Sequence, residues 1–373
     1  MTNVEPPQKA PNSNRSKLMS KYGDHYVSLL PYAIPIVIEI GSDLTAFIEI
    51  NKDGNLSPKV EQLCKDIRED IWNRMGVKVP GFRFRTNTFD LQGTSYNVQI
   101  FENTVARDKL LLEKKVFTGN LETLNSFKII GEEANHPITG NKVWMIKQGD
   151  WETLEMAGHK LIEPINYLLL QLQGVIENHL SEFLGHQEVA NLLYDTVKDT
   201  TLYTSFEEIL ENSFELSMFT TILKHLVREK VPIKALGSIV TEFSYSRLEN
   251  KESFLIIEGI RSLDDVRPLL PGNNDQYSFY QIGPSLEEEI FSSIDRSHPQ
   301  PALIMEPQIC ADILTKIRSY ANSQKQMAFV VKNAQIRPFL KGLIEIEFSD
   351  IPILSRNELL PILEDRILKE IDF

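Results

Sequence analysis

The segment from Ser205 to Ser246 constrains the fold most, because apolar residues recur through it at the spacing of an α-helix. One apolar stripe runs from Met218 to Val227, and a second follows Pro232. Proline ends a helix because it has no N–H to donate and disfavours helical backbone at the residue before it. The segment therefore predicts a hairpin of two helices joined at Pro232.

A capping box predicts where the helices of this region begin. Thr204 and Ser205 are followed three residues later by Glu207 and Glu208. In this pairing a hydroxyl and a carboxylate satisfy the first free N–H groups of a helix. The segment holds no group suited to catalysis. A chain organised around such a hairpin is typical of a platform for other proteins rather than of an enzyme.

Length and charge narrow the class of protein. The chain has 373 residues, which is too long for one average domain, so we expect roughly two to four units. Its net charge of -13 disfavours nucleic-acid binding over the whole surface, because phosphate contacts require clustered Lys and Arg. Cys64 and Cys310 lie far apart in helical patterns, which favours buried reduced thiols over a disulfide or a metal pair. These features are typical of a cytosolic protein.

The sequence contains no membrane-spanning pattern. No apolar run approaches the ~20 residues that a spanning helix needs. The longest, residues 31–41, is interrupted by Pro35 and Glu39, and the N-terminus lacks the apolar core of a secretory signal. We therefore expect any membrane contact to be made by a segment that is missing from this chain.

Periodicity changes along the chain and divides it into stretches. Ile34, Ile36, Ile38 and Ile40 alternate with other residues and predict a strand, and a helix is expected from Pro58 to Trp72. The expected stretches are 1–30, a linker or tail; 34–104 with 153–177, an α/β subdomain; 105–152, a small, mainly β subdomain inserted into it; 178–270, an all-helical subdomain; and 276–373, a second α/β subdomain with strands at 279–282, 328–331 and 344–348. The predicted fold class is α/β and α, with four subdomains.

No motif for cofactor or metal chemistry is present. The chain lacks both glycine-rich phosphate-binding patterns, C-x-x-C pairs and histidines spaced as metal ligands on a helix, so we expect no cofactor and no metal. The run Glu287–Glu289 is typical of a solvated first helical turn. A hydrolase that uses His136 and His159 remains an alternative, although no substrate suggests itself.

The helical hairpin allows a second alternative, a DNA-binding regulator. Residues 217–247 resemble a helix-turn-helix and contain five basic residues against two acidic ones, a local charge of +3 in a chain whose remainder carries -16. Because such a weakly basic hairpin more often contacts protein, we favour a protein contact and expect no nucleic-acid partner.

Several segments, in order, resemble one known family. They are MGVKVPGFRFRTN (75–87), NHPITGNKVWMI (135–146), AGHKLIEPINYLLLQLQGVIENHLSEFLGHQEVANLL (157–193), LSMFTTILKHLVREKVPIKALGSIVTEF (216–243), PALIMEPQICADILTKI (301–317) and AFVVKNAQIRPFLKGLI (328–344). Residues 34–360 resemble the cytosolic C-terminal half of the large export-gate protein of type III secretion systems. That is the flagellum/hypersensitive-response/invasion export-pore family.

The resemblance implies an architecture and partners. Family members carry an N-terminal membrane domain, and their cytosolic part has four subdomains and assembles into a ring, typically a nonamer. The ring receives secretion substrates and their chaperones, and it contacts a gatekeeper protein and the ATPase stalk. The chain is thus expected at the cytoplasmic face of the bacterial inner membrane, as a non-enzymatic homo-oligomer.

Two departures from the flagellar pattern favour the virulence branch. Ile138-Thr139-Gly140-Asn141 stands where flagellar members have an aromatic-glycine-leucine-proline turn, and Lys234-Ala235 replaces an Arg-Asp pair. The family's chaperone groove lies between the inserted subdomain and its neighbour. The resemblance implies that Ile138, Thr139 and Asn166 contribute to it here. We also expect hinge motion at turns near 174–178 and 271–274.

Overall fold

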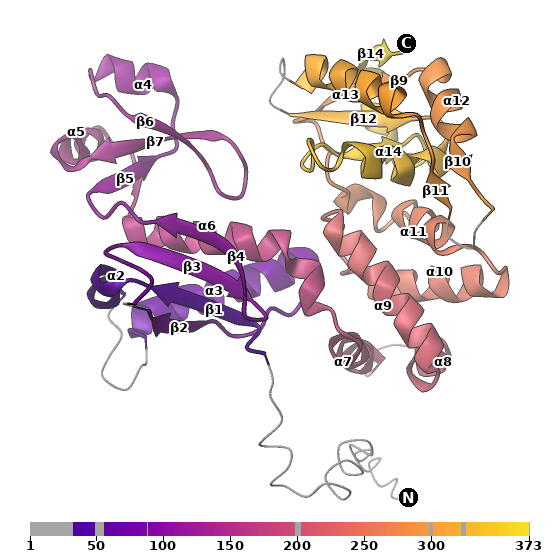
Figure 1. Ribbon diagram of the computed structural model, residues 1–373, viewed down its shortest axis with the longest axis horizontal. Coiled ribbons are helices and arrows are strands. Elements are labelled where there is room, and N and C mark those ends of the chain that lie inside the picture. The colour runs from indigo at the N-terminus through magenta and orange to yellow at the C-terminus, as the bar shows by residue number, and fades with distance from the viewer. Residues whose placement is uncertain are drawn as a thin grey trace, which may run out of the picture.

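The computed structural model describes residues 33–48, 56–87, 89–197, 203–297, 301–321 and 326–372. The expected tail, residues 1–30, lies outside these ranges. The described chain forms a sheet with three helices, a small second sheet with short helices, a helical region and a C-terminal sheet with helices (Figure 1). The predicted fold class, mixed α/β and α, is confirmed.

The first sheet has the strand order β2-β1-β3-β4. β1 is parallel to β2 and antiparallel to β3, which pairs with β4 in turn. The elements of this subdomain are β1 (Ile36–Ile40), α2 (Ser42–Phe47), α3 (Pro58–Met75), β2 (Arg83–Thr86), β3 (Ser95–Ile100), β4 (Asn103–Lys109) and α6 (Pro164–Asn178). Ile36, Ile38 and Ile40 are buried in one core with α3 and α6, as their alternation predicts. Gly76 ends α3 in the left-handed conformation, with φ 74°.

The inserted subdomain has its own sheet, of order β6-β7-β5-β8, and its own small core. Its elements are β5 (Lys114–Phe117), α4 (Leu121–Ser126), β6 (Glu132–Asn135), β7 (Lys142–Lys147), η1 (Gln148–Asp150), α5 (Trp151–Met156) and β8 (Leu161–Ile162). The predicted start at residue 105 falls inside β4, which belongs to the first sheet. The predicted end at 152 falls inside α5, and Leu154 of that helix is part of the insertion's core. Strand pairing between distant segments, which no local pattern shows, sets these boundaries.

The helical subdomain follows α6. Its elements are η2 (Leu180–Phe183), α7 (His186–Val197), α8 (Tyr203–Glu211), α9 (Ser213–Arg228), α10 (Leu236–Leu248), α11 (Ser253–Arg261) and η3 (Arg267–Leu269). α9 and α10 form the predicted hairpin, and Phe219 packs edge-on against Phe243 with ring centroids 5.0 Å apart. The predicted capping box is wrong, because Ser205 lies inside α8. The Asn212 side chain instead caps α9 and accepts from the N–H of Phe214 at 3.0 Å.

The C-terminal sheet has the order β13-β12-β9-β14, and all its pairs are parallel. In this subdomain β10 and β11 form a separate antiparallel pair. The elements of the subdomain are β9 (Ser278–Ile282), α12 (Pro284–Ser292), β10 (Ile294–Asp295), β11 (Ala302–Leu303), α13 (Pro307–Ala321), β12 (Met327–Val331), η4 (Ala334–Ile336), α14 (Arg337–Ile344), β13 (Ile353–Ser355), η5 (Pro361–Arg366) and β14 (Ile367–Ile371). The strand predicted at 344–348 is wrong. Ile344 ends α14 and Ile346 is 95% exposed, so the alternation there does not mark a buried strand face.

Candidate interaction sites at the subdomain joints

The predicted docking residues Ile138 and Thr139 lie in the turn between β6 and β7. The side chain of His136 shapes this turn, because its Nδ1 accepts hydrogen bonds from the backbone N–H groups of Ile138 at 3.3 Å and Thr139 at 3.4 Å. Burial lowers the pKa of His136, which favours the neutral ring that can accept these bonds.

This turn rests on α6. A Cβ atom on Gly174 would stand 2.6 Å from the carbonyl oxygen of Pro137, so the close approach requires glycine. Asn166, the third predicted docking residue, is exposed in the first turn of the same helix. Eight residues of helix span about 12 Å. Asn166 therefore lies at the start of α6, close to β8 in the chain. Ile138 and Thr139 lie in the turn that contacts the same helix about two turns later, at Gly174.

The two histidines of the hydrolase alternative serve packing and turn geometry. The His159 ring lies edge-on to Phe117, at 5.5 Å between centroids, and to Phe127, at 6.1 Å. Within the described residues, no hydrogen bond or ion pair joins either His136 or His159 to a carboxylate or hydroxyl side chain. Neither histidine therefore activates a side-chain nucleophile by a hydrogen bond among the described residues.

Within the described residues, few polar contacts cross the joint between the first subdomain and the helical subdomain, although buried apolar side chains of both belong to one core. The N–H of Ile233, in the turn between α9 and α10, donates to the carbonyl oxygen of Met75 at 2.9 Å. An exposed ion pair joins Lys78 Nζ to Asp195 Oδ2 at 2.6 Å. A cavity of about 260 Å³ lies beside this pair, lined by residues of η2 and α7 that include Phe183 and Leu192.

The turn at Pro232 is buried. Val231 and Ile233 are at most 1% exposed. On the other side of this turn, Lys230 Nζ lies 2.9 Å from Asp350 Oδ1 of the C-terminal subdomain. The hairpin thus contacts both α/β subdomains through its turn. That geometry disfavours the DNA-binding alternative, because a recognition hairpin must present this region to a groove.

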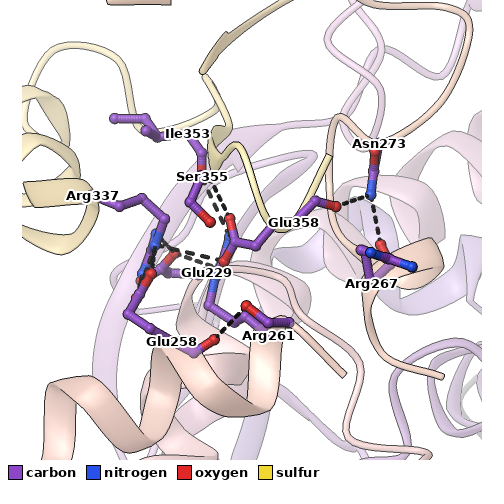
Figure 2. Close-up of polar contacts among 10 residues, drawn as sticks. Glu229, Glu258, Arg261, Arg267, Asn273, Arg337, Ile353, Ser355 and Glu358 are labelled. Carbon is purple, nitrogen blue, oxygen red and sulfur yellow. Dashed lines mark hydrogen bonds and ion pairs between the residues drawn. The ribbon is translucent and has the colours of Figure 1, made fainter. Parts of the chain in front are cut away.

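The joint between the helical and C-terminal subdomains contains a cluster of buried charges (Figure 2). We call Glu229, Glu258, Arg261, Arg337 and Glu358 the ionic cluster. Arg337, at the start of α14, is fully buried; its Nε lies 2.7 Å from Glu258 Oε2 and its Nη1 lies 2.6 Å from Glu229 Oε2. Arg261 Nε lies 2.5 Å from Glu358 Oε1 and its Nη1 lies 3.0 Å from Glu229 Oε2.

The ionic cluster shifts the pKa values of two of its carboxyl groups, Glu229 and Glu258, in opposite directions. Burial alone would raise the pKa of Glu229, but Arg337 and Arg261 outweigh burial and lower that pKa to about 2. Burial dominates at Glu258 and raises its pKa, although Arg337 opposes the change. Glu229 is therefore held ionised against two arginines, and breaking either contact would leave a charge in an apolar surrounding.

Hydrogen bonds between the Asn273 side chain and backbone groups reinforce the same joint. The amide of Asn273 donates to the carbonyl oxygens of Arg267 and Glu358, each at 2.8 Å, and its Oδ1 accepts from the N–H of Leu360 at 3.0 Å. Residues 271–274, predicted as a hinge, are thus tied to both sides. The other predicted hinge, residues 174–178, is the last turn of α6.

No group of His, Cys, Asp or Glu side chains in the described ranges is arranged to hold a metal ion. Cys64 is buried, Cys310 is half-buried, and both are free thiols. Burial raises the pKa of Cys64 to about 12, so its thiol is unreactive. In the part of the chain that the structure describes, no helix has the length and apolar character to cross a bilayer.

Comparison with known proteins assigns the family. The model of the FHIPEP family matches residues 2–364. The chain belongs to the FHIPEP family. It is 25% identical over 331 residues to the flagellar biosynthesis protein FlhA of Bacillus subtilis, covering 87% of this chain and 47% of that protein. It is 23% identical over 300 residues to the low calcium response locus protein D of Yersinia pestis, covering 79% and 42%. The chain thus spans about half the length of the curated relatives it matches.

Solved structures share its fold. The Chlamydia pneumoniae CdsV protein superposes with a TM-score of 0.79 at 23% identity, covering 92% of this chain and 99% of that one. The nonameric SctV-C of EPEC gives a TM-score of 0.70 at 18% identity, with 92% and 99% covered. A complex of Chlamydia pneumoniae CdsV with CdsO contains a chain that matches with a TM-score of 0.76. The fold expected from the family resemblance is confirmed.

Proposed function

We propose that the chain is the ring-forming cytosolic part of a type III secretion export gate. It would stand at the cytoplasmic face of the bacterial inner membrane and pass secretion substrates toward a membrane channel formed by a segment outside this chain. The observation that carries the proposal is the shared fold, over 92% of the chain, with SctV-C, which was solved as a nonamer. Family membership supports it.

A ring suits this role physically. Several copies that each bind a substrate weakly can jointly retain it, because after the first contact the second forms at high effective concentration. Each subunit can then release its substrate quickly while the ring retains it. We accordingly assign the chain a binding and transfer function, with no reaction of its own.

The partners follow from this role. We assign substrate–chaperone docking to the surface around Ile138, Thr139 and Asn166, and we expect further contacts with a gatekeeper protein and with the ATPase stalk. The CdsV–CdsO complex supports a stalk-type contact, because a protein of the same fold was solved with a second protein bound. The Ile138–Asn141 turn and Lys234-Ala235 favour the virulence branch over the flagellar one.

Assembly tests the proposal directly. We expect the purified chain to form closed rings of nine at high concentration, or when it is tethered to a membrane, in native mass spectrometry and electron microscopy. A chain that stays monomeric under both conditions, or that turns over a small molecule, would contradict the proposal.

A substitution tests the docking surface. Ile138→Asp should weaken binding of the chaperone–substrate complex from the same secretion system by about tenfold, the effect of placing an unpaired charge in an interface. Ile346→Asp, at a 95% exposed position of the C-terminal subdomain, is the matched control. Equal binding by both variants would remove Ile138 from the docking surface.

A further inference from the structure

A small pocket lies at the joint between the helical and C-terminal subdomains, beside the ionic cluster. Its volume is about 40 Å³. A single water molecule needs roughly 15 Å³, so the pocket has room for a larger group. The lining comes from both subdomains, with residues 228–230 and Arg261 on one side and Lys341 and residues 349–353 on the other. We call this space the joint pocket. A group bound in it would touch both subdomains at once.

The joint pocket has an excess of positive charge. Four of its lining side chains are Lys or Arg and two are carboxylates. Both carboxylates already have partners, because Glu229 is held by the arginines of the ionic cluster and Asp350 Oδ1 lies 2.9 Å from Lys230 Nζ. Among the described residues, no carboxylate forms an ion pair with the other two cations that concern us, Arg228 and Lys341. These two charges are available to an anion.

Lys341 is the buried cation of this pair. It lies in the last turn of α14 and is only 8% exposed. Its Nζ donates to the carbonyl oxygens of Ser349 at 2.7 Å and Ile351 at 3.2 Å. An ammonium group has three N–H donors, so one donor is left for a further acceptor. Burial lowers the pKa of Lys341, and a negative charge nearby would stabilise its ammonium form.

Arg228 supplies the exposed side of the joint pocket. It is the last residue of α9 and is open to solvent. Its planar guanidinium can donate two parallel hydrogen bonds to an oxyanion. The neighbouring Arg261 is less available, because it donates to Glu358 and to the carbonyl oxygen of Ile353 (Figure 2). An anion held by Arg228 from the solvent side would therefore meet Lys341 on the buried side.

We propose that the joint pocket binds one small inorganic oxyanion, of the size of phosphate or sulfate, between Arg228 and Lys341. An oxyanion offers several acceptor oxygens, which suits the fork of one side chain and the remaining donor of the other. Because these side chains belong to different subdomains, the bound anion ties α9 to α14 and stiffens the joint. The site lies within one copy of the chain and does not depend on the proposed ring.

Isothermal titration calorimetry of the full chain tests the site. Inorganic phosphate and sulfate are each titrated at constant ionic strength, with chloride as the control anion. We expect one bound phosphate or sulfate per chain and no saturable chloride binding. Arg228→Gln should weaken oxyanion binding by about tenfold or more, because charge-assisted hydrogen bonds are lost. Lys59→Gln removes the same charge at an exposed position of α3, away from the joint pocket, and should bind like the unmodified chain.

Hydrogen exchange locates the effect at the joint. The N–H of Leu360 donates to Asn273 Oδ1 across this joint. Phosphate should slow exchange of the Leu360 amide in the unmodified chain and in Lys59→Gln, and it should have no such effect in Arg228→Gln. Lys341→Met, which removes the buried cation, should also abolish oxyanion binding, with circular dichroism as the check on folding. If Lys341→Met does not fold, the exposed Arg228→Gln variant still decides the question.

Three outcomes would overturn the proposal. The first is the absence of saturable binding to the unmodified chain at millimolar phosphate and sulfate. The second is equal binding by the unmodified chain and Arg228→Gln, which would place the anion elsewhere. The third is chloride binding as tight as phosphate binding, which would show general screening of charge. Ring assembly is measured separately, so none of these results bears on the proposed function.

Discussion

The helical subdomain meets its two neighbours in physically different ways. Toward the C-terminal subdomain the contact is the ionic cluster, in which Arg337 and Glu358 are fully buried. Toward the first subdomain, the polar contacts that the described residues show include the Ile233–Met75 backbone bond and the Lys78–Asp195 pair, whose side chains are 57% and 51% exposed, and the remaining contact is apolar core. A buried charge must keep its partner, whereas an exposed pair exchanges its partner for water at little cost. We infer that the helical and C-terminal subdomains move as one body. Bending then occurs at the joint between the first subdomain and the helical subdomain, which we call the first joint.

Removing the central arginine should have the largest effect. Arg337→Met leaves Glu229 and Glu258 without their main partner, and we expect the free energy of unfolding to fall by about 3–5 kcal/mol. Urea denaturation measures this change. Arg318→Met, which removes a partner of Glu347 in an exposed pair, is the control and should cost less than about 1 kcal/mol. Similar losses for both variants would show that the ionic cluster is no stronger than a surface pair.

Acid should loosen the same joint. The pKa of Glu229 is lowered, so its ionised form stabilises the fold above the ordinary carboxyl pKa of 4.5, and this contribution disappears as the pH falls toward about 2. Up to about 3 kcal/mol is at stake. The raised pKa of Glu258 acts in the opposite direction and offsets part of the loss. Glu229→Gln should therefore make the loss of stability between pH 5 and pH 2.5, as measured by urea denaturation, shallower than in the unmodified chain. An unchanged slope would exclude Glu229 as its source.

The first joint should be sensitive to backbone shape. Gly76→Ala places a side chain at φ 74° and brings its Cβ within 3.2 Å of the Lys234 nitrogen. We expect a loss of about 1–2 kcal/mol. Gly81→Ala has open space around its Cβ and serves as control. Equal thermal stability of the two variants would mean that the close approach of Gly76 to the hairpin turn is not needed.

The exposed pair should matter least for stability. Lys78→Ala should change the free energy of unfolding by less than about 1 kcal/mol, because the pair is solvated. The same variant should increase hydrogen exchange of the Ile233 amide, whose bond to Met75 crosses the joint. A loss of stability as large as that of Arg337→Met would remove the contrast between the two joints.

The sequence predicts the helices of the α9–α10 hairpin well. Each buries one face, so its apolar residues recur at helical spacing. The stripe from Met218 to Val227 corresponds to the buried face of α9, and Gly76 ends α3 as its position predicts. Alternation of apolar and charged residues predicts a strand wrongly where the segment pairs with no other strand. Residues 344–348 alternate in this way, yet Ile346 points into solvent. Pairing is a long-range property, which also explains the misplaced boundaries of the inserted subdomain.

The ionic cluster was not predicted, for a related reason. Arg337 lies 108 residues from Glu229 and 79 from Glu258, so no local spacing links them. The local sequence shows an arginine at the start of an apolar helix. An exposed arginine has the same local sequence pattern, so the pattern does not reveal that Arg337 is buried. For the predicted docking residues, the resemblance supplied the positions, and the sequence contains no sign that the turn at Pro137 rests on Gly174.

Distance measurements across the two joints test the central claim most directly. In a chain with Cys64 and Cys310 replaced by Ala, one pair of spin labels at Thr241→Cys and Thr315→Cys spans the joint with the ionic cluster. A second pair at Lys65→Cys and Thr241→Cys spans the first joint. We predict a narrow distance distribution for the first pair and a broad or two-peaked one for the second. A broad distribution for the first pair, with the second narrow, would contradict the account.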